Sequence, residues 1–195
     1  MLVAQFDAAV RATDRLFFAL LPDADAAAQL AQCSQRLRSQ LGLTGRPIAT
    51  ERLHITLHFV SDSVGLPPGM VAALSAAVAS IAAPPFDITL DRAKSFCRKP
   101  RNRPFVLVPR QDIPALNALQ RSLAAAMTQA RLGQHAESQF RPHLTLLYDD
   151  RCVTVRAIET IAWTAREFVL VHSLIGRARH IELARWPLRA QRSAD

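Results

Sequence analysis

The sequence has few of the features that several classes of protein require. Its three cysteines are Cys33, Cys97 and Cys152, and none of them stands in a Cys-x-x-Cys pair. An odd count without a spacing pattern argues against a disulfide framework, so we expect a reducing compartment and a cytoplasmic protein. No apolar run approaches the roughly 18 residues of a membrane span, and the charged Asp7 and Arg11 argue against a signal peptide. We therefore expect no contact with a membrane.

Lysine is also scarce in this basic chain. Of the 24 basic residues only Lys94 and Lys99 are lysine, and with 16 acidic residues the formal net charge is +8. The arginine side chain suits bidentate contacts with phosphate, although an arginine-rich composition also follows from the base composition of a genome. The charge therefore permits a nucleic-acid partner without establishing one. The chain has no Gly-x-Ser-x-Gly elbow and no glycine-rich phosphate loop.

The rest of the composition is that of a globular protein, with 50% hydrophobic and 21% charged residues. Alternation and helical periodicity predict a mixed order of strands and helices. Strands are expected at 15–21, 53–60, 86–91, 105–108, 143–148, 153–163, 167–175 and 179–186. Helices are expected at 24–41, from the loop 65–69 to about 82, and from Asp112 to about 132. We expect one α+β domain over residues 14–188, with flexible tails at 1–13 and 189–195.

Two of the expected strands share the pattern His-x-Thr-Leu. They are His54-Ile55-Thr56-Leu57-His58-Phe59 and His143-Leu144-Thr145-Leu146-Leu147-Tyr148. Side chains alternate across a strand, so residues two apart share a face. The first stretch then divides into a core set, Ile55, Leu57 and Phe59, and an opposite polar set, His54, Thr56 and His58.

These stretches belong to a longer correspondence between the two halves of the chain. His143 follows His54 by 89 residues, and at the same offset Asp112 follows Asp23. Each half then reads as a strand, an Asp-capped helix and a His strand, without a gap. A duplicated unit would produce this order. A pseudo-twofold arrangement of the two units would place His54 and His143 across one cleft.

Two imidazoles that face one point form an acid–base pair. Unperturbed histidine titrates near pH 6.5, so at neutral pH one ring can accept a proton while the other donates one. Each of these roles contributes roughly 10² to 10⁴ in rate. The hydroxyls of Thr56 and Thr145, two residues along the same faces, would donate hydrogen bonds to anionic oxygens in the transition state. Such a set suits in-line cleavage of a phosphoester.

A metal site is the main chemical alternative. His54 and His58 have the i, i+4 spacing of a helical zinc site, but Ile55 stands where that motif has its Glu, and the stretch is strand-like. No third ligand has a useful spacing, so we expect no metal and no cofactor. We interpret His58 as a cleft-wall or structural residue, because Leu147 occupies its place in the second stretch. The histidines without a partner motif, interpreted as structural or exposed, are His135, His172 and His180.

The paired motif resembles the two-histidine (2H) phosphoesterase superfamily, most closely its branch of RNA 2′,3′-cyclic phosphodiesterases, also called 2′-5′ RNA ligases. The stretches 15–20, 140–143 and 182–188 support the resemblance, which covers about residues 14–188. It implies a bilobal α+β fold in which two antiparallel sheets with flanking helices line a central cleft. It also implies metal-free hydrolysis of a terminal 2′,3′-cyclic phosphate to a 2′-phosphate.

The resemblance also implies roles for individual residues. His54 would protonate the departing 3′ oxygen, His143 would activate water, and Thr56 and Thr145 would hold the phosphate. Phe140 would pack against the terminal base, as aromatic side chains do with unpaired nucleotides, or anchor its loop in the core.

One position departs from the family pattern. Many members carry an Arg five residues after the second His, whereas this chain has Tyr148. Either Arg141 or the basic loop takes the place of that Arg, or the substrate differs. The arginines of the basic loop are Arg98, Arg101 and Arg103, and this loop is equally well interpreted as a solvated surface.

The sequence thus predicts a monomeric enzyme that acts on RNA ends or on a small cyclic nucleotide phosphate. Its leading function is RNA 2′,3′-cyclic phosphodiesterase activity carried out by His54 and His143. Three alternatives remain: the reverse reaction that joins 2′-5′ ends, cyclic phosphodiesterase action on a small nucleotide, and a basic RNA-binding module without catalysis.

Overall fold

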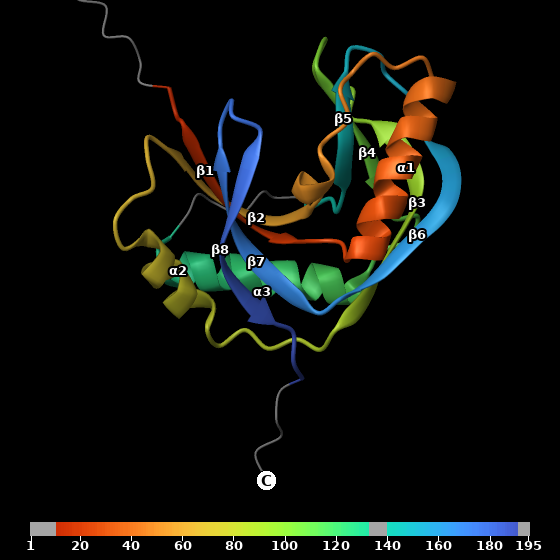
Figure 1. Cartoon of the computed structure of the whole chain (residues 1–195). Helices are drawn as coiled ribbons and strands as arrows, with labels where there is room; N and C mark the ends of the chain where they lie inside the picture. The colour runs from red at the N-terminus through yellow and green to blue at the C-terminus, as the bar shows by residue number, and fades with distance from the viewer. Residues whose placement is uncertain (1–10, 133–139, 191–195) are drawn as a thin grey trace, which may run out of the picture.

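The computed structural model describes residues 11–132 and 140–190, so His135 and the polar loop around it lie outside the described residues. The described chain has the mixed order of elements shown in Figure 1, and the predicted α+β class is confirmed. The strands are β1 Asp14–Leu20, β2 Ile55–Ser63, β3 Phe86–Ser95, β4 Arg103–Val108, β5 Leu144–Asp149, β6 Arg156–Ala165, β7 Glu167–Leu174 and β8 Arg179–Pro187. The helices are α1 Ala24–Gln40, α2 Met70–Val78 and α3 Pro114–Gln129, with a 3₁₀ turn η1 at Thr50–Arg52.

All of these strands join in one sheet, in the order β6-β3-β4-β5-β2-β1-β7-β8, with antiparallel neighbours. The prediction of two separate sheets is therefore wrong. Four strands lie on each side of the contact between β2 and β5, which consists of the single pair Ile55 with Leu144. From that contact the two groups of strands diverge toward the top of Figure 1.

The two groups of strands are arranged alike about the central contact. β1 lies next to β2 as β4 lies next to β5, and α1 follows β1 as α3 follows β4. The helices cross over: α1 contacts β5 and β6, while α3 contacts β2 and β3 and is itself covered by α2. A duplicated unit would produce this arrangement, but the duplication itself stays a prediction.

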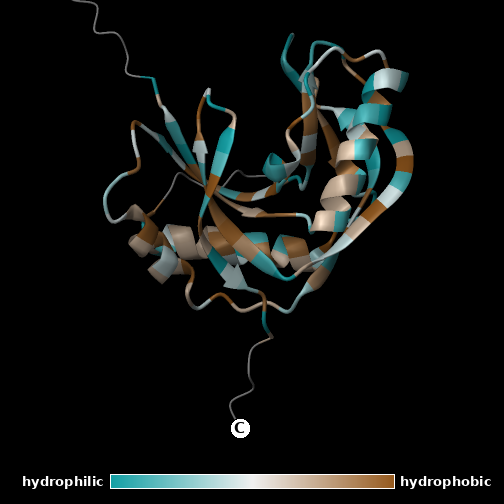
Figure 2. Ribbon diagram, in the orientation of Figure 1, coloured by the Kyte–Doolittle hydropathy of each residue, from teal (hydrophilic) through white to brown (hydrophobic). Residues whose placement is uncertain are grey.

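The two faces of the sheet differ in how deeply they are covered. Figure 2 shows hydrophobic residues on the strands and helices where these pack together. The residues of β1 that enter this main core are Leu16, Phe18 and Leu20. The opposite face carries a small apolar cluster made of Phe17, Ala19, Val169 and Val171. We call the face that bears this cluster, and its continuation across β2 and β5, the open face.

A β-bulge interrupts β2 at Leu57. Against β1, Thr56 pairs with Ala19 and His58 pairs with Phe18, so Leu57 is an extra residue in the ladder. An extra residue shifts the alternation of the following side chains by one position. His58 and Phe59 therefore exchange faces, until a second extra residue, Val60, restores the original alternation for Asp62.

The same irregularity interrupts β5 at Leu146. Against β4, Thr145 pairs with Val106 and Leu147 pairs with Phe105, so Leu146 is the extra residue there. Leu146 follows the bulged residue of β2 by the same 89 residues that separate the two histidines. The repeat in the sequence is thus also a repeat in local backbone geometry.

These bulges overturn part of the predicted alternation. His58 does not share the face of His54: it is 5% exposed, lies opposite Phe18, and its Nε2 has no hydrogen-bond partner among the described residues. Phe59, predicted for the core, lies on the open face instead, opposite Phe17. In β5 the corresponding change leaves Tyr148 exposed on the same face.

A disulfide bond links Cys97 with Cys152, with 5.8 Å between their Cα atoms. The prediction that no disulfide forms is wrong, because β3 and β5 flank β4 in the same direction and the segments that follow them come together. The Ser95 N–H donates to the carbonyl oxygen of Val153 at 2.9 Å beside the bond. Only Cys33 is free among the three, and it is buried. The cysteine count therefore no longer argues for a reducing compartment.

The segment between α1 and η1 is anchored on β5. The carboxylate of Asp149 accepts hydrogen bonds from the backbone N–H groups of Thr44 at 2.7 Å, Gly45 at 2.8 Å and Arg151 at 2.8 Å. Burial by itself would raise the pKa of Asp149, but these hydrogen bonds together lower it. Gly45 lies so close to β5 that a Cβ atom would be 1.9 Å from the carbonyl oxygen of Tyr148. Only glycine fits there without a shift of the backbone.

The two long helices begin differently, although the offset aligns their starts. Asp23 caps α1, and its carboxylate accepts from the N–H of Ala26 at 2.9 Å. The predicted cap at Asp112 is wrong, because α3 begins at Pro114 with Ile113 as its cap residue. Proline at the first helical position has no N–H that needs a cap and already has a helical φ.

Residues at both ends of the described chain contact the rest of the fold, and the predicted bounds of the tails stay a prediction. The Thr13 N–H donates to the carbonyl oxygen of Ser63 at 2.9 Å, and Arg189 forms an isolated bridge with Ala83. The outer parts of both tails lie outside the described residues.

The difference between the two helix starts predicts a difference in stability. Asp23→Ala should lower the free energy of unfolding by about 1 kcal/mol, because the cap of α1 is lost. Asp112→Ala removes an exposed aspartate without a cap role and should change it by less than about 0.5 kcal/mol. Urea denaturation of the two variants measures both values, and equal losses would restore Asp112 as a cap.

Candidate functional site

The single pair between β2 and β5 determines where the predicted site residues meet. Ile55 and Leu144 are fully buried in the core, so the residues on either side of each point to the open face. Continuing the antiparallel register by one residue places each histidine opposite the threonine of the other strand. Facing residues of an antiparallel pair have Cβ atoms about 5 Å apart. The side chains that gather at this point are His54, Thr56, His143 and Thr145.

The two imidazoles are held in the same way. The Nδ1 of His54 donates to the carbonyl oxygen of Arg52 at 2.7 Å, and the Nδ1 of His143 donates to the carbonyl oxygen of Arg141 at 2.8 Å. A carbonyl oxygen only accepts hydrogen bonds, so Nδ1 carries the proton in the neutral ring. In both rings Nε2 is then the nitrogen that can exchange a proton with a ligand.

An aromatic ring packs against each imidazole. Phe17 stacks on His54 with 4.9 Å between ring centroids, and Phe96 meets His143 edge-on at 5.0 Å. The ammonium of Lys94 lies 5.5 Å from the centroid of Phe96, which brings a cation close to the second histidine. The sequence indicated neither phenylalanine as a site residue, because both lie outside the motif, Phe17 in β1 and Phe96 directly after β3.

A third imidazole belongs to this group. His180 of β8 lies edge-on to His54, with 5.2 Å between ring centroids, and also contacts Phe17 at 5.5 Å. The prediction that His180 is merely structural or exposed missed this contact. No signal in the sequence could have found it, because β8 is three strands away from β2 in the sheet.

The surroundings favour the neutral forms of His54 and His180. Burial lowers the pKa of His54, and the nearby charges of His143 and Arg52 lower it further, against the opposing effect of the backbone hydrogen bond. The pKa of His180 falls to about 4, chiefly by burial and then through His54 and Arg52. The influence of His143 on the pKa of His54 agrees with the strand register, which brings the two rings to the same part of the open face.

The other predicted contacts lie in different environments. Thr56 and Thr145 are half-buried beside the imidazoles. Phe140 is partly buried against the main core, as its structural interpretation expects. Arg141 is exposed, and its carbonyl group orients the second histidine. Tyr148 is 44% exposed on the open face.

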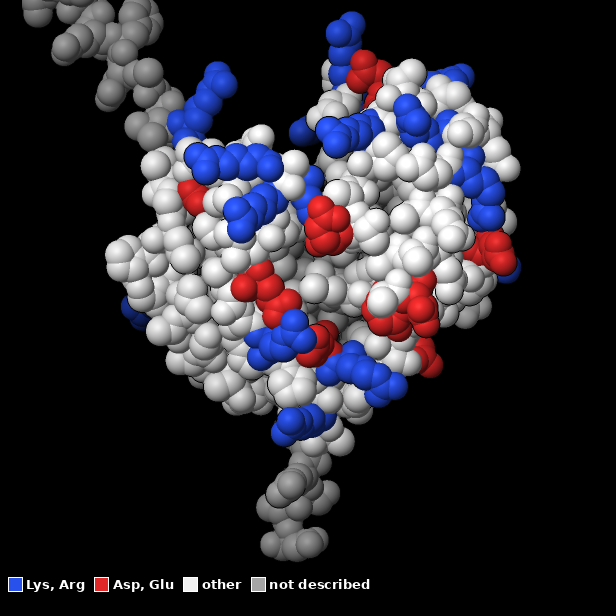
Figure 3. Space-filling model, viewed as in Figure 1, with Lys and Arg blue, Asp and Glu red and all other residues white. Residues whose placement is uncertain are grey.

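The arginines of the basic loop differ in whether their side chains are available to a ligand. Arg103 is committed to the fold, since its side chain donates hydrogen bonds to the carbonyl oxygens of Lys99 and Asp150. Arg98 and Arg101 are exposed. In Figure 3, Lys and Arg side chains line both sides of the hollow at the top of the molecule. This charge would attract an anionic ligand to the hollow.

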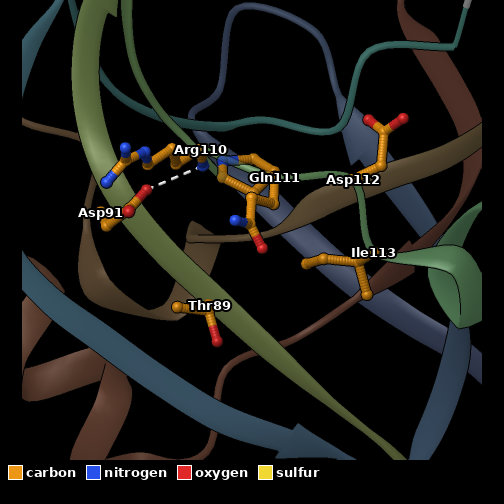
Figure 4. Close-up of a pocket in the computed structure, with 7 residues that line it drawn as sticks. Thr89, Asp91, Arg110, Gln111, Asp112 and Ile113 are labelled. Atoms are coloured by element: carbon orange, nitrogen blue, oxygen red, sulfur yellow. Dashed lines mark hydrogen bonds between the residues drawn. The ribbon is translucent and has the colours of Figure 1, made fainter.

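Two other kinds of site are absent from residues 11–132 and 140–190. No three His, Cys, Asp or Glu side chains there are grouped as a metal site would need, and no helix there is long and apolar enough to cross a membrane. A pocket of about 390 Å³ lies between β3 and the connection from β4 to α3 (Figure 4). It is lined by residues such as Thr89, Asp91 and Arg110, and none of the predicted site residues borders it.

Comparison with known proteins identifies one family and a close group of structures. Residues 21–175 match the family model described as the 2′-5′ RNA ligase superfamily. Over 148 residues the chain is 32% identical to the RNA 2′,3′-cyclic phosphodiesterase of Escherichia coli (strain K12), an alignment that covers 74% of this chain and 80% of that protein.

Solved structures of E. coli LigT have the same fold. The apo form is 30% identical and has a TM-score of 0.75, with 92% of this chain and 99% of that chain covered. The complex of LigT with 3′-AMP is 30% identical and has a TM-score of 0.73, with 90% and 98% covered.

The coupling between the imidazoles predicts their titration. In the free protein the pKa of His180 should be about 4, and the pKa of His54 should lie below its ordinary value of about 6.5. His143→Gln removes a like charge, so it should raise the pKa of His54, while burial continues to hold that pKa below the ordinary value. NMR titration of the imidazole signals measures these changes. If the pKa of His54 is the same in the wild-type protein and in the variant, the two rings do not interact.

Proposed function

Because the chain belongs to the 2′-5′ RNA ligase superfamily, we propose that it hydrolyses terminal RNA 2′,3′-cyclic phosphates to 2′-phosphomonoesters. The observation that carries the proposal is the pair of imidazoles, His54 and His143, tethered alike through Nδ1 at the point where β2 and β5 meet. The name of the E. coli relative and the 3′-AMP bound to LigT support a nucleotide substrate. No step of the proposed reaction requires a metal.

The proposed reaction is one in-line displacement at phosphorus. Water attacks the phosphorus as the bond to the 3′ oxygen breaks. The Nε2 of His143 accepts a proton from the attacking water, and the Nε2 of His54 donates a proton to the departing 3′ oxygen. One water is consumed, and the product carries a 2′-phosphate and a free 3′-hydroxyl. Exchange of protons with solvent then returns both rings to their starting states.

The threonines complete the proposed phosphate site. Each stands opposite the histidine of the other strand, so the hydroxyls of Thr56 and Thr145 border the same small space as the two Nε2 atoms. A hydroxyl there would donate to a non-bridging phosphate oxygen, whose charge shifts as the reaction proceeds. The proposed site thus has two hydroxyl donors and two imidazoles. They are related by the same approximate twofold arrangement as β2 and β5.

The direction of proton transfer follows the family pattern, with His54 as the acid. Its lowered pKa means that His54 is neutral in the free site at neutral pH. A bound cyclic phosphate brings a negative charge next to the ring, and such a charge raises the pKa of an imidazole. Substrate binding would therefore supply the protonated form of His54 that the reaction needs.

Two related activities use the same residues. If a 5′-hydroxyl end replaces water as the nucleophile, the same displacement yields a 2′-5′ linkage. Because Tyr148 stands in the place of the family Arg, the substrate of this chain could instead be a small cyclic nucleotide phosphate. Incubation with a panel of cyclic phosphates, followed by mapping of the products, separates these activities. RNA binding with no turnover of any member of the panel would instead favour the non-catalytic module.

The acid–base pair predicts how histidine substitutions combine. His54→Ala and His143→Ala should each lower kcat on a cyclic phosphate by about 10² or more. The double variant should lose little more than either single variant, because the two groups act as a unit. Steady-state kinetics measures all three, and a double variant whose loss is the product of two mild losses would contradict joint action.

The control for these variants is His58→Leu. It removes an imidazole from the same strand and substitutes the residue found at the corresponding place in β5. This variant should keep most of the activity, because His58 lies in the core. The wild-type rate should also be bell-shaped against pH, with limbs that belong to the coupled pair. A profile that is flat through neutrality would contradict the mechanism.

A further prediction concerns metal dependence. Activity of the wild-type protein should persist in excess EDTA, because the imidazoles exchange the protons and the hydroxyls bind the phosphate. The measurement is the rate of cyclic phosphate hydrolysis before and after dialysis against the chelator. Loss of activity that zinc restores would support the alternative of a metal site at His54.

A further inference from the structure

The guanidinium of Arg15 is fixed as a flat platform on the open face. Its Nε and Nη2 donate to the two carboxylate oxygens of Asp62, each at 2.7 Å. Its central carbon lies 5.5 Å from the centroid of the Phe59 ring. The side chain nevertheless remains 49% exposed. One edge and one face of this planar cation are thus occupied by the protein, and the rest is accessible.

Tyr148 lies on the open face in the other group of strands, where it is 44% exposed. The pKa of Arg15 is raised chiefly by its hydrogen bonds to Asp62, and Tyr148 adds a smaller electrostatic contribution. This contribution agrees with a position of Tyr148 on the same open face as Arg15, although one belongs to β5 and the other to β1. The repeated bulge explains the placement, since it brings Phe59 and Tyr148 to corresponding positions on the open face. The two rings stand where β2 and β5 have begun to diverge.

The platform lies at the distance of one nucleoside from the proposed phosphate site. On β1, Ala19 pairs with Thr56 and Phe17 pairs with Phe59, so the Phe59 ring behind the guanidinium is two β1 residues, or about 7 Å, beyond the threonine. A base attached to the ribose that carries the phosphate can span this distance.

The charge of the platform favours a base over a second phosphate. Asp62 neutralises the guanidinium of Arg15, so an additional anion would meet a carboxylate as well as a cation. A neutral planar base loses nothing from this pairing. Bases of unpaired nucleotides stack on aromatic rings and on guanidinium planes. The exposed tyrosine supplies a second stacking surface.

We infer that Arg15 and Tyr148, with Phe59 behind the guanidinium, bind the nucleobase of the nucleotide that carries the cyclic phosphate. The inference rests on the proposed function, because it assigns the base portion of that same substrate. It replaces Phe140 as the residue that contacts the terminal base, since Phe140 packs against the core. It also gives Tyr148 a role other than that of the family Arg.

A binding experiment tests this without any turnover. The chain has one tyrosine, so ¹³C-tyrosine labelling yields NMR signals from Tyr148 alone. Adenosine 2′-phosphate and inorganic phosphate are titrated in parallel into the wild-type protein. The nucleotide should shift the ring signals upfield, through the ring current of a stacked base, and phosphate should not. An unchanged signal at the highest soluble nucleotide concentration, or an equal shift with phosphate, would overturn the inference.

Kinetics provides the second test. The substrates are adenosine 2′,3′-cyclic phosphate and the methyl riboside 2′,3′-cyclic phosphate, which has no base. Tyr148→Ser and Arg15→Ala should each lower kcat/KM on the adenosine substrate by about five- to a hundredfold and leave the base-free substrate unaffected. Tyr148→Phe should retain both activities, because the stacking ring is kept.

The matched control is Arg36→Ala, since Arg36 is also an ion-paired arginine, 48% exposed, on the surface of α1. It should change neither rate. Equal losses on both substrates, or no loss on either, would overturn the assignment of a base site. If the wild-type protein hydrolyses neither substrate, the proposed function fails, and the tyrosine titration still decides whether a base binds here.

Discussion

The pairing of Ile55 with Leu144 is the contact on which the candidate site depends. It is the only residue pair that joins β2 to β5 in the described sheet. Because it is antiparallel, it places a histidine of each strand opposite a threonine of the other. Because it ends after one pair, the strands are free to diverge and leave space for a ligand. A longer ladder would close that space, and no ladder would separate the imidazoles.

The repeated bulge is the second constraint. At Leu57 and at Leu146 one extra residue reverses the alternation, so the side chains beyond it exchange faces. Without the bulges, His58 would face the ligand and Phe59 would be buried. With them, the open face receives an aromatic ring from each group of strands at matching distances from the phosphate site. In the proposed complex, the two bulges would thus extend the site from the phosphate to the base.

Much of the local structure was predictable, since it rests on short-range signals. The strand that carries His54, the cap of α1 at Asp23 and the equivalence of the two His-x-Thr-Leu motifs all depend on residues within one or two turns or pleats. The errors arose where distant segments meet. Cys97 and Cys152 pair because the segments that follow β3 and β5 come together. The proline at the start of α3 made a cap at Asp112 unnecessary.

The sequence by itself determined the elements, the catalytic candidates His54 and His143, and the family, because alternation and a repeated motif are properties of neighbouring residues. The tertiary structure alone decided that one sheet joins the two halves, that His58 is buried and that His180 meets His54. It also placed Arg15 and Tyr148 on the same open face. The physical reason is that a backbone bulge and the curvature of a sheet depend on which strands pair. That pairing is set by packing between residues far apart in the chain.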